Sequence, residues 1–131
     1  MVEVRVLVVD DSVQVRALLA RALRQRGYVV HEAADGPAAL RLAFDVRPAV
    51  AIVDQWMPDM TGAELIRLLR AAPIPEIRAM AIIGLSGRAG SEKELLGAGA
   101  VTFLAKPFGE SELAAALASV LGLDEPATGA A

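Results

Sequence analysis

Three observations predict a doubly wound α/β fold for this chain. Short apolar runs recur along the sequence, and their β-branched content is typical of strands buried on both faces of a parallel sheet. Amphipathic helical patterns occupy the segments between these runs. With 131 residues, the chain is long enough for one domain with a core of its own. Strand–helix alternation of this kind implies right-handed crossovers and places ligands beyond the carboxyl ends of the strands.

The predicted strands are short and almost wholly apolar. The first contains Val6-Leu7-Val8-Val9 and the fourth contains Ile82-Ile83-Gly84-Leu85, and neither run is long enough for a helix. The same pattern assigns strands to residues 5–9, 28–33, 49–53, 80–85 and 101–105.

Five helices are predicted between and after these strands. The first spans 12–26 and ends at Gly27. Its apolar side chains recur at spacings of three and four, which predicts one buried stripe made of Val15, Leu18, Leu19, Ala22 and Leu23. The second runs from about 35–37, where Pro37 suits a first helical turn, to the break at Arg47-Pro48.

The last three helices are bounded by proline and glycine. The third spans 61–72, directs Leu65, Leu68 and Leu69 inward, and stops before Pro73 and Pro75, which cannot continue a helix. The fourth spans 91–98. The fifth begins near 111–112 and ends at Gly122. We therefore expect one domain over residues 1–122, and a flexible tail or linker stub over 123–131, which lacks apolar periodicity.

Composition narrows the class of protein. The chain has no cysteine, so disulfides and thiolate metal sites are excluded. It opens without a signal-type apolar segment and has no apolar stretch of membrane-spanning length, so a cytoplasmic location with no membrane partner is expected. A formal charge of −3 argues against direct nucleic-acid binding. Basic residues do gather in the first helix, as either a solvated face or a docking surface: Arg16, Arg21, Arg24 and Arg26.

Polar residues close four of the predicted strands. Asp10-Asp11 follow the first strand, Asp54 the third, Ser86 the fourth and Lys106 the fifth. Each has an ordinary explanation when taken singly, such as a helix N-cap, a turn or a solvated lysine. Their joint placement predicts instead that they share one edge of the sheet.

These residue types match phosphoryl-transfer chemistry. Clustered carboxylates repel one another unless a cation keeps them ionised, and an oxygen-only ligand set suits Mg²⁺, with Mn²⁺ as a substitute. Lys106 supplies a positive charge and Ser86 a hydroxyl that can donate to a phosphoryl oxygen, while Gly87 leaves room for that group to approach. The cluster therefore contains a nucleophile, a metal site, a cation and a hydrogen-bond donor.

Over about residues 4–121 the sequence resembles the receiver domains of two-component response regulators. Four motifs carry the resemblance, in the order of that family: Asp10-Asp11, Asp54-Gln55-Trp56-Met57-Pro58 with Gly62 following, Ser86-Gly87, and Phe103-Leu104-Ala105-Lys106-Pro107-Phe108. The resemblance implies a flavodoxin-like five-stranded parallel sheet in the order 2-1-3-4-5 with five helices.

The resemblance also implies roles for individual residues. Asp54 is the expected phospho-acceptor, and Asp11, Asp54 and the backbone carbonyl of Trp56 are the expected Mg²⁺ ligands, with Asp10 assisting through water. Lys106 would pair with the phosphoryl group. Ser86 would move to bond it, and Phe103 would turn inward, altering the surface of the predicted fourth helix, fifth strand and fifth helix.

Two positions are unusual for that family. Trp56 lies two residues after the acceptor and Arg88 two after Ser86. We hypothesise that Trp56 and Arg88 restrict the attacking water and prolong the aspartyl phosphate. The alternative is that Trp56 merely packs on a loop.

The implied function is a phosphorylation-dependent signalling switch rather than an enzyme acting on other substrates, since phosphotransfer to and hydrolysis from Asp54 would be self-catalysed. The expected partners are a sensor histidine kinase or histidine phosphotransfer protein and an unidentified downstream protein. A homodimer, a complete chain and a domain cut from a larger regulator all stay open. The rival functions are a phosphorylation-independent receiver-like module and an aspartyl-nucleophile phosphatase. A phosphatase usually has a second acid where this chain has Trp56.

Overall fold

The computed structural model describes residues 3–87 and 90–122 and confirms the predicted fold class. Five parallel strands form one sheet in the order β2-β1-β3-β4-β5. The strands are β1 (Arg5–Val9), β2 (Val29–Ala33), β3 (Val50–Asp54), β4 (Ala81–Ser86) and β5 (Thr102–Ala105). The predicted strand positions are therefore right to within one residue at each end.

Six helices are present among the described residues, one more than predicted. They are α1 (Val13–Gln25), α2 (Gly36–Val46), α3 (Gly62–Arg70), α4 (Pro75–Arg78), α5 (Ser91–Ala98) and α6 (Glu110–Leu121). The prediction of five helices was wrong because Pro75 was taken only as a helix breaker. Proline also suits the first turn of a helix, and Pro75 begins the four-residue α4.

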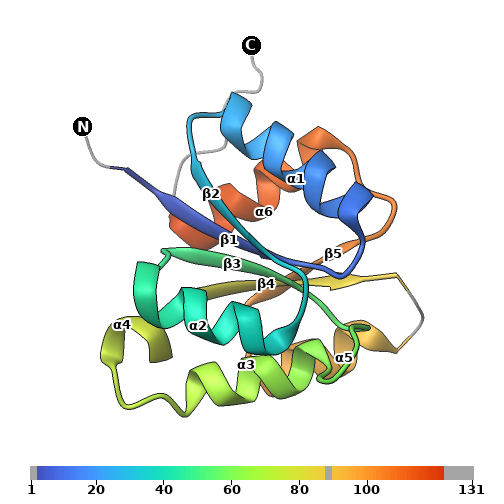
Figure 1. Cartoon of the computed structure of the whole chain (residues 1–131). Helices are drawn as coiled ribbons and strands as arrows, with labels where there is room; N and C mark the ends of the chain where they lie inside the picture. Colours follow the sequence, from blue (N-terminus) through green and yellow to red (C-terminus); the bar gives the residue numbers. More distant parts are fainter. Residues whose placement is uncertain (1–2, 88–89, 123–131) are drawn as a thin grey trace.

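The sheet lies between two helical layers (Figure 1). Helices α1 and α6 cover one face, and α2, α3, α4 and α5 cover the other. Alternate side chains of each strand lie in two separate hydrophobic cores, one on each face of the sheet. Val6 and Val8 pack with α1 and α6, whereas Leu7 and Val9 pack with α2 and α3. Both faces are buried, which explains why the strands read as continuous apolar runs.

Two leucines predicted to face inward are exposed. Leu18 on α1 is 61% exposed and Leu68 on α3 is 48% exposed. Each precedes a fully buried leucine, Leu19 or Leu69, and one residue turns about 100° around a helix, so both lie outside the buried stripe.

Helix ends follow the local sequence signals. Ser12 caps α1, Asp35 caps α2, and Thr61 forms a reciprocal capping box with Glu64 at α3. Gly27, just after α1, has a positive φ of 91°, as expected where a helix terminates. No helix within the described ranges is both long and apolar enough to cross a membrane. The tail predicted at 123–131 lies outside the described residues.

Candidate functional site

The carboxyl ends of the parallel strands bring the predicted polar residues to one edge of the sheet. Asp10 and Asp11 follow β1, Asp54 ends β3, Ser86 ends β4, and Lys106 follows β5. Since β1, β3, β4 and β5 are neighbours in the sheet, residues far apart in sequence meet there.

The three aspartates form a compact group. One carboxylate oxygen from each of Asp10, Asp11 and Asp54 lies within 4.8 Å of the others. Asp10 and Asp54 are buried, whereas Asp11 is exposed and opens the group to solvent. Three carboxylates at this separation repel, so the group favours a cation.

Lys106 provides a cation that contacts two members of the group. Its Nζ lies 2.9 Å from an oxygen of Asp10 and 3.0 Å from an oxygen of Asp54. Burial by itself lowers the pKa of Lys106, but its hydrogen bonds to Asp10 and Asp54 and the negative charges of these two residues together outweigh burial and raise that pKa above its usual value. Lys106 is therefore a permanent positive charge beside Asp54.

Several effects of opposite sign act on the pKa of Asp54. Burial raises its pKa, the hydrogen bond from Lys106 lowers it, and the nearby charges of Asp10 and Asp11 raise it again, with a net rise. Its neighbour Gln55 is also buried and accepts a hydrogen bond from the Ala63 amide at 2.8 Å, which ties the end of β3 to α3.

Asp10 has both carboxylate oxygens engaged. One accepts from the Ser12 amide at 2.9 Å and the other from Lys106. Arg16 donates to the Asp10 carbonyl at 2.8 Å and pairs with Glu32 at 3.5 Å. Arg16 is therefore part of neither a solvated face nor a docking surface, the two alternatives for the basic residues of the first helix. It is a structural residue that holds the β1–α1 turn.

The other predicted site residues surround this group. The Ser86 carbonyl accepts from the Lys106 amide at 2.8 Å, and a Cβ on Gly87 would lie 3.4 Å from the Lys106 side chain. Phe103 is 38% exposed on β5. Trp56 is 43% exposed, and its indole donates to the Ser91 hydroxyl of α5 at 3.2 Å. Arg88 lies outside the described residues.

Sequence reasoning missed the contacts that link this edge to α5. Ser86 donates to Glu92 at 3.1 Å and Gln55 donates to Glu94 at 3.4 Å. Acidic residues in the first turn of a helix indicate only a favourable interaction with the helix dipole. The sequence therefore did not predict that Glu92 and Glu94 contact Ser86 and Gln55.

The family model of the response regulator receiver domain matches residues 6–118. The chain belongs to this family. Receiver domains of response regulators are signalling switches, and Asp10, Asp11 and Asp54 form an acidic cluster of the kind at which receiver domains bind Mg²⁺.

Two named relatives illustrate the similarity. The receiver is 38% identical over 129 residues to the response regulator MprA of Mycolicibacterium vanbaalenii, covering 97% of this chain and 54% of MprA. It is 39% identical over 119 residues to the transcriptional regulatory protein PrrA of Mycobacterium tuberculosis, covering 89% of this chain and 49% of PrrA. The chain thus spans about half the length of the curated relatives it matches.

Solved structures agree with the family assignment. The chemotaxis protein CheY4 of Vibrio cholerae superposes with a TM-score of 0.84 at 36% identity, covering 91% of this chain and 99% of that one. The receiver domain of sensor histidine kinase PA1611 from Pseudomonas aeruginosa superposes with a TM-score of 0.85 at 31% identity, covering 92% and 99%. The PA1611 structure has a magnesium ion coordinated in its active-site cleft.

Proposed function

We propose that this receiver domain, over residues 1–122, is a cytoplasmic switch that accepts a phosphoryl group on Asp54 with the help of Mg²⁺. The observation that carries the proposal is the position of Lys106 Nζ, 3.0 Å from Asp54 and 2.9 Å from Asp10, within a group that also includes Asp11. This arrangement combines a buried nucleophile with a fixed positive charge and an oxygen-rich cation site.

The donor set fits Mg²⁺. It consists only of carboxylates, and Mg²⁺ prefers one or two carboxylates together with waters and phosphate oxygens. Asp11 and Asp54, with the backbone carbonyl of Trp56, would hold the ion. Asp10, whose two oxygens accept hydrogen bonds from Ser12 and Lys106, would assist through water. The bound ion would neutralise charge on the phosphoryl oxygens.

The chain's own residues account for the remaining chemistry. A carboxylate oxygen of Asp54 attacks phosphorus, the bond from phosphorus to the donor breaks, and the electron pair leaves with the donor nitrogen or oxygen, which takes a proton from solvent. Lys106 pairs with the phosphoryl oxygens as they arrive. Attack of water on phosphorus later hydrolyses the aspartyl phosphate, which releases inorganic phosphate and restores the Asp54 carboxylate.

We propose that the switch follows from movement of Ser86 and Phe103. The Ser86 hydroxyl would donate to a phosphoryl oxygen, and the half-exposed Phe103 ring would turn inward. The surface that changes is formed by α5, β5 and α6, which are the fourth helix, fifth strand and fifth helix of the sequence prediction. Leu96 on α5, Val101 just before β5 and Phe103 on β5 are exposed, which supports this surface as the contact for a downstream protein or a second copy.

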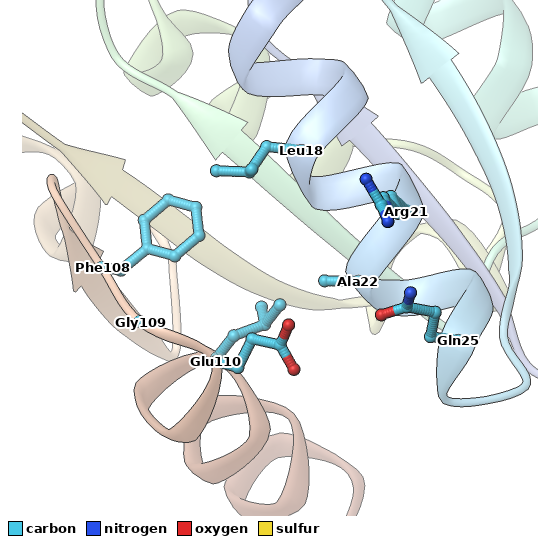
Figure 2. Close-up of a pocket in the computed structure, with 8 residues that line it drawn as sticks. Leu18, Arg21, Ala22, Gln25, Phe108, Gly109 and Glu110 are labelled. Carbon is cyan, nitrogen blue, oxygen red and sulfur yellow. The ribbon is translucent and has the colours of Figure 1, made fainter.

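The phosphoryl donor is proposed to be a histidine kinase or histidine phosphotransfer protein that docks beside α1. A groove of about 340 Å³ lies between α1 and the start of α6, as Figure 2 shows, with Leu18 and Phe108 on opposite walls. An adjoining hollow shares Leu18 and Phe108 and is also lined by Lys106. A protein seated in the groove would therefore reach the acceptor edge.

Labelling from acetyl phosphate tests the function. With Mg²⁺, the wild-type chain should acquire phosphate, and Asp54→Asn should abolish the label. The matched control is Asp59→Asn, because Asp59 lies on the same loop with a φ of 72° that asparagine tolerates. Labelling that persists in Asp54→Asn, or that fails in the wild type, would favour a phosphorylation-independent module.

A further inference from the structure

Among the described residues, three side chains at the site donate hydrogen bonds to the first turn of α5. Ser86 Oγ donates to Glu92 at 3.1 Å, Trp56 Nε1 donates to Ser91 at 3.2 Å, and Gln55 Nε2 donates to Glu94 at 3.4 Å. Ser86 ends β4, and the other two donors directly follow Asp54. Of these contacts, the one at Ser86 involves the hydroxyl that the proposed switch uses.

We propose that Glu92 is a latch on this hydroxyl: in the unphosphorylated receiver its carboxylate accepts the Ser86 hydrogen bond that a phosphoryl group on Asp54 would take over. Glu92 then sets how readily the domain switches. The inference rests on the proposed function, since it assumes that Ser86 bonds the phosphoryl group.

Competition follows from the chemistry of the hydroxyl. A serine has one proton to donate, so Ser86 cannot direct it both to Glu92 and to a phosphoryl oxygen. The bond to an ionised carboxylate is charge-assisted and therefore stronger than a bond to a neutral acceptor. Because Ser86 is buried, breaking its bond to Glu92 is unfavourable, and a bond to a phosphoryl oxygen would offset that loss.

The carboxylate of Glu92 is oriented before any ligand arrives. Its other oxygen accepts from the Gly90 amide at 3.0 Å, at the amino end of α5. Glu92 also lies in the first turn of α5, where the helix dipole favours a negative charge. The acceptor that Ser86 must abandon is thus preformed.

Release of the latch would carry the signal into α5. Once Ser86 turns to the phosphoryl group, the hydrogen bond between β4 and the first turn of α5 is lost, while those from Gln55 and Trp56 persist. Phosphorylation on one strand end would therefore alter the attachment of a helix on the proposed output surface.

Beryllofluoride, which imitates a phosphoryl group on aspartate, provides the test. Its affinity for the Mg²⁺-loaded chain is measured by titration calorimetry in the wild type, Glu92→Ala and Glu92→Gln. Loss of the latch should tighten binding by about 3- to 10-fold in Glu92→Ala, with a smaller gain in Glu92→Gln, which keeps the shape of the side chain. The matched control is Glu94→Gln, which removes the same charge from the same helical turn and should leave affinity unchanged.

A double-mutant cycle separates the latch from simple charge removal. In a Ser86→Ala background the Glu92→Ala change should alter affinity by less than about twofold, because the hydroxyl is absent. Equal tightening with and without Ser86, equal tightening in Glu94→Gln, or unchanged affinity in both Glu92 variants would overturn the latch. A wild-type chain that fails to bind beryllofluoride, or binding that survives Asp54→Asn, would instead overturn the proposed function.

Discussion

At the scale of single residues, the ionised side chain of Asp54 lowers the free energy of unfolding. Burial and the charges of Asp10 and Asp11 raise its pKa, and Lys106 offsets only part of that rise. The folded chain therefore holds the Asp54 proton more tightly than the unfolded chain does. As pH rises from the unfolded pKa of 3.8 through the folded pKa, ionisation reduces the free energy of unfolding.

Replacing Asp54 should consequently stabilise the metal-free protein. Asp54→Asn keeps the shape but not the charge, and Lys106 retains Asp10 as a partner. We expect a gain of about 1 kcal/mol at pH 7.5, or roughly 3–5 °C in Tm. Thermal unfolding in EDTA at several pH values measures it, and the gain should shrink on acidification and on addition of Mg²⁺. A variant less stable than the wild type at pH 7.5 would contradict this description of Asp54.

Trp56 is proposed to lengthen the life of the aspartyl phosphate. Its indole is half-exposed two residues after Asp54 and donates a hydrogen bond to Ser91 of α5, a position from which it would limit the approach of water. Trp56→Asn should speed loss of the label by about 3- to 10-fold, followed as decay after removal of acetyl phosphate.

Trp56→Phe is the matched control, because it keeps a ring and loses the hydrogen bond. If the label decays at the wild-type rate in Trp56→Phe and faster in Trp56→Asn, the size of the ring and not its hydrogen bond protects the aspartyl phosphate. An unchanged rate in Trp56→Asn would mean that this side chain only packs on its loop.

At the scale of elements, α3 begins against the backbone at the end of β3. A Cβ on Gly62 would overlap the carbonyl oxygen of Asp54, and the Gly62 amide donates to Gln55 at 2.9 Å. Any side chain at position 62 must therefore displace either α3 or the end of β3.

Gly62→Ala should lower the free energy of unfolding by about 1–3 kcal/mol and slow phosphate labelling. Gly97→Ala is the control, because a Cβ there meets no atom within 4 Å and alanine favours a helix. Chemical denaturation and labelling rates test both variants. Wild-type stability and labelling in Gly62→Ala would show that the close approach has no consequence.

The elements themselves were largely predictable from sequence, for physical reasons that differ between them. Strands buried on both faces leave continuous apolar runs, so their positions were right. Periodicity alone did not tell which of two adjacent leucines faces the sheet, and Leu18 and Leu68 were misplaced. The contacts that Glu92 and Glu94 accept from Ser86 and Gln55 were not predictable, because these donors lie at the ends of other elements.

At the scale of the whole molecule, the topology assembles the candidate site. Asp10, Asp54 and Lys106 are far apart in sequence and meet because their strands are parallel neighbours. That convergence was predictable from the strand ends alone. The groove beside α1 was not, because it depends on how α1 and the start of α6 pack together (Figure 2).

The groove gives a prediction about protein donors. Leu18→Asp should slow transfer about tenfold from a phosphorylated histidine phosphotransfer protein that labels the wild type, since an apolar contact is lost. Labelling by acetyl phosphate, which needs no docking, should be unchanged. Leu68→Asp is the control, since Leu68 is also exposed but lies on α3, across the sheet. Equal effects on both donors would place docking elsewhere.

Asp54 is proposed to carry the phosphoryl group, and locating that group on the chain tests this role most directly. Borohydride reduces an aspartyl phosphate to homoserine, so the chain labelled with acetyl phosphate and Mg²⁺ can be reduced, digested and sequenced by mass spectrometry. We predict homoserine at position 54 and unmodified aspartate at positions 10, 11 and 59. Homoserine at one of those positions, or none at position 54 in a labelled chain, would contradict the assignment of the phosphoryl group to Asp54.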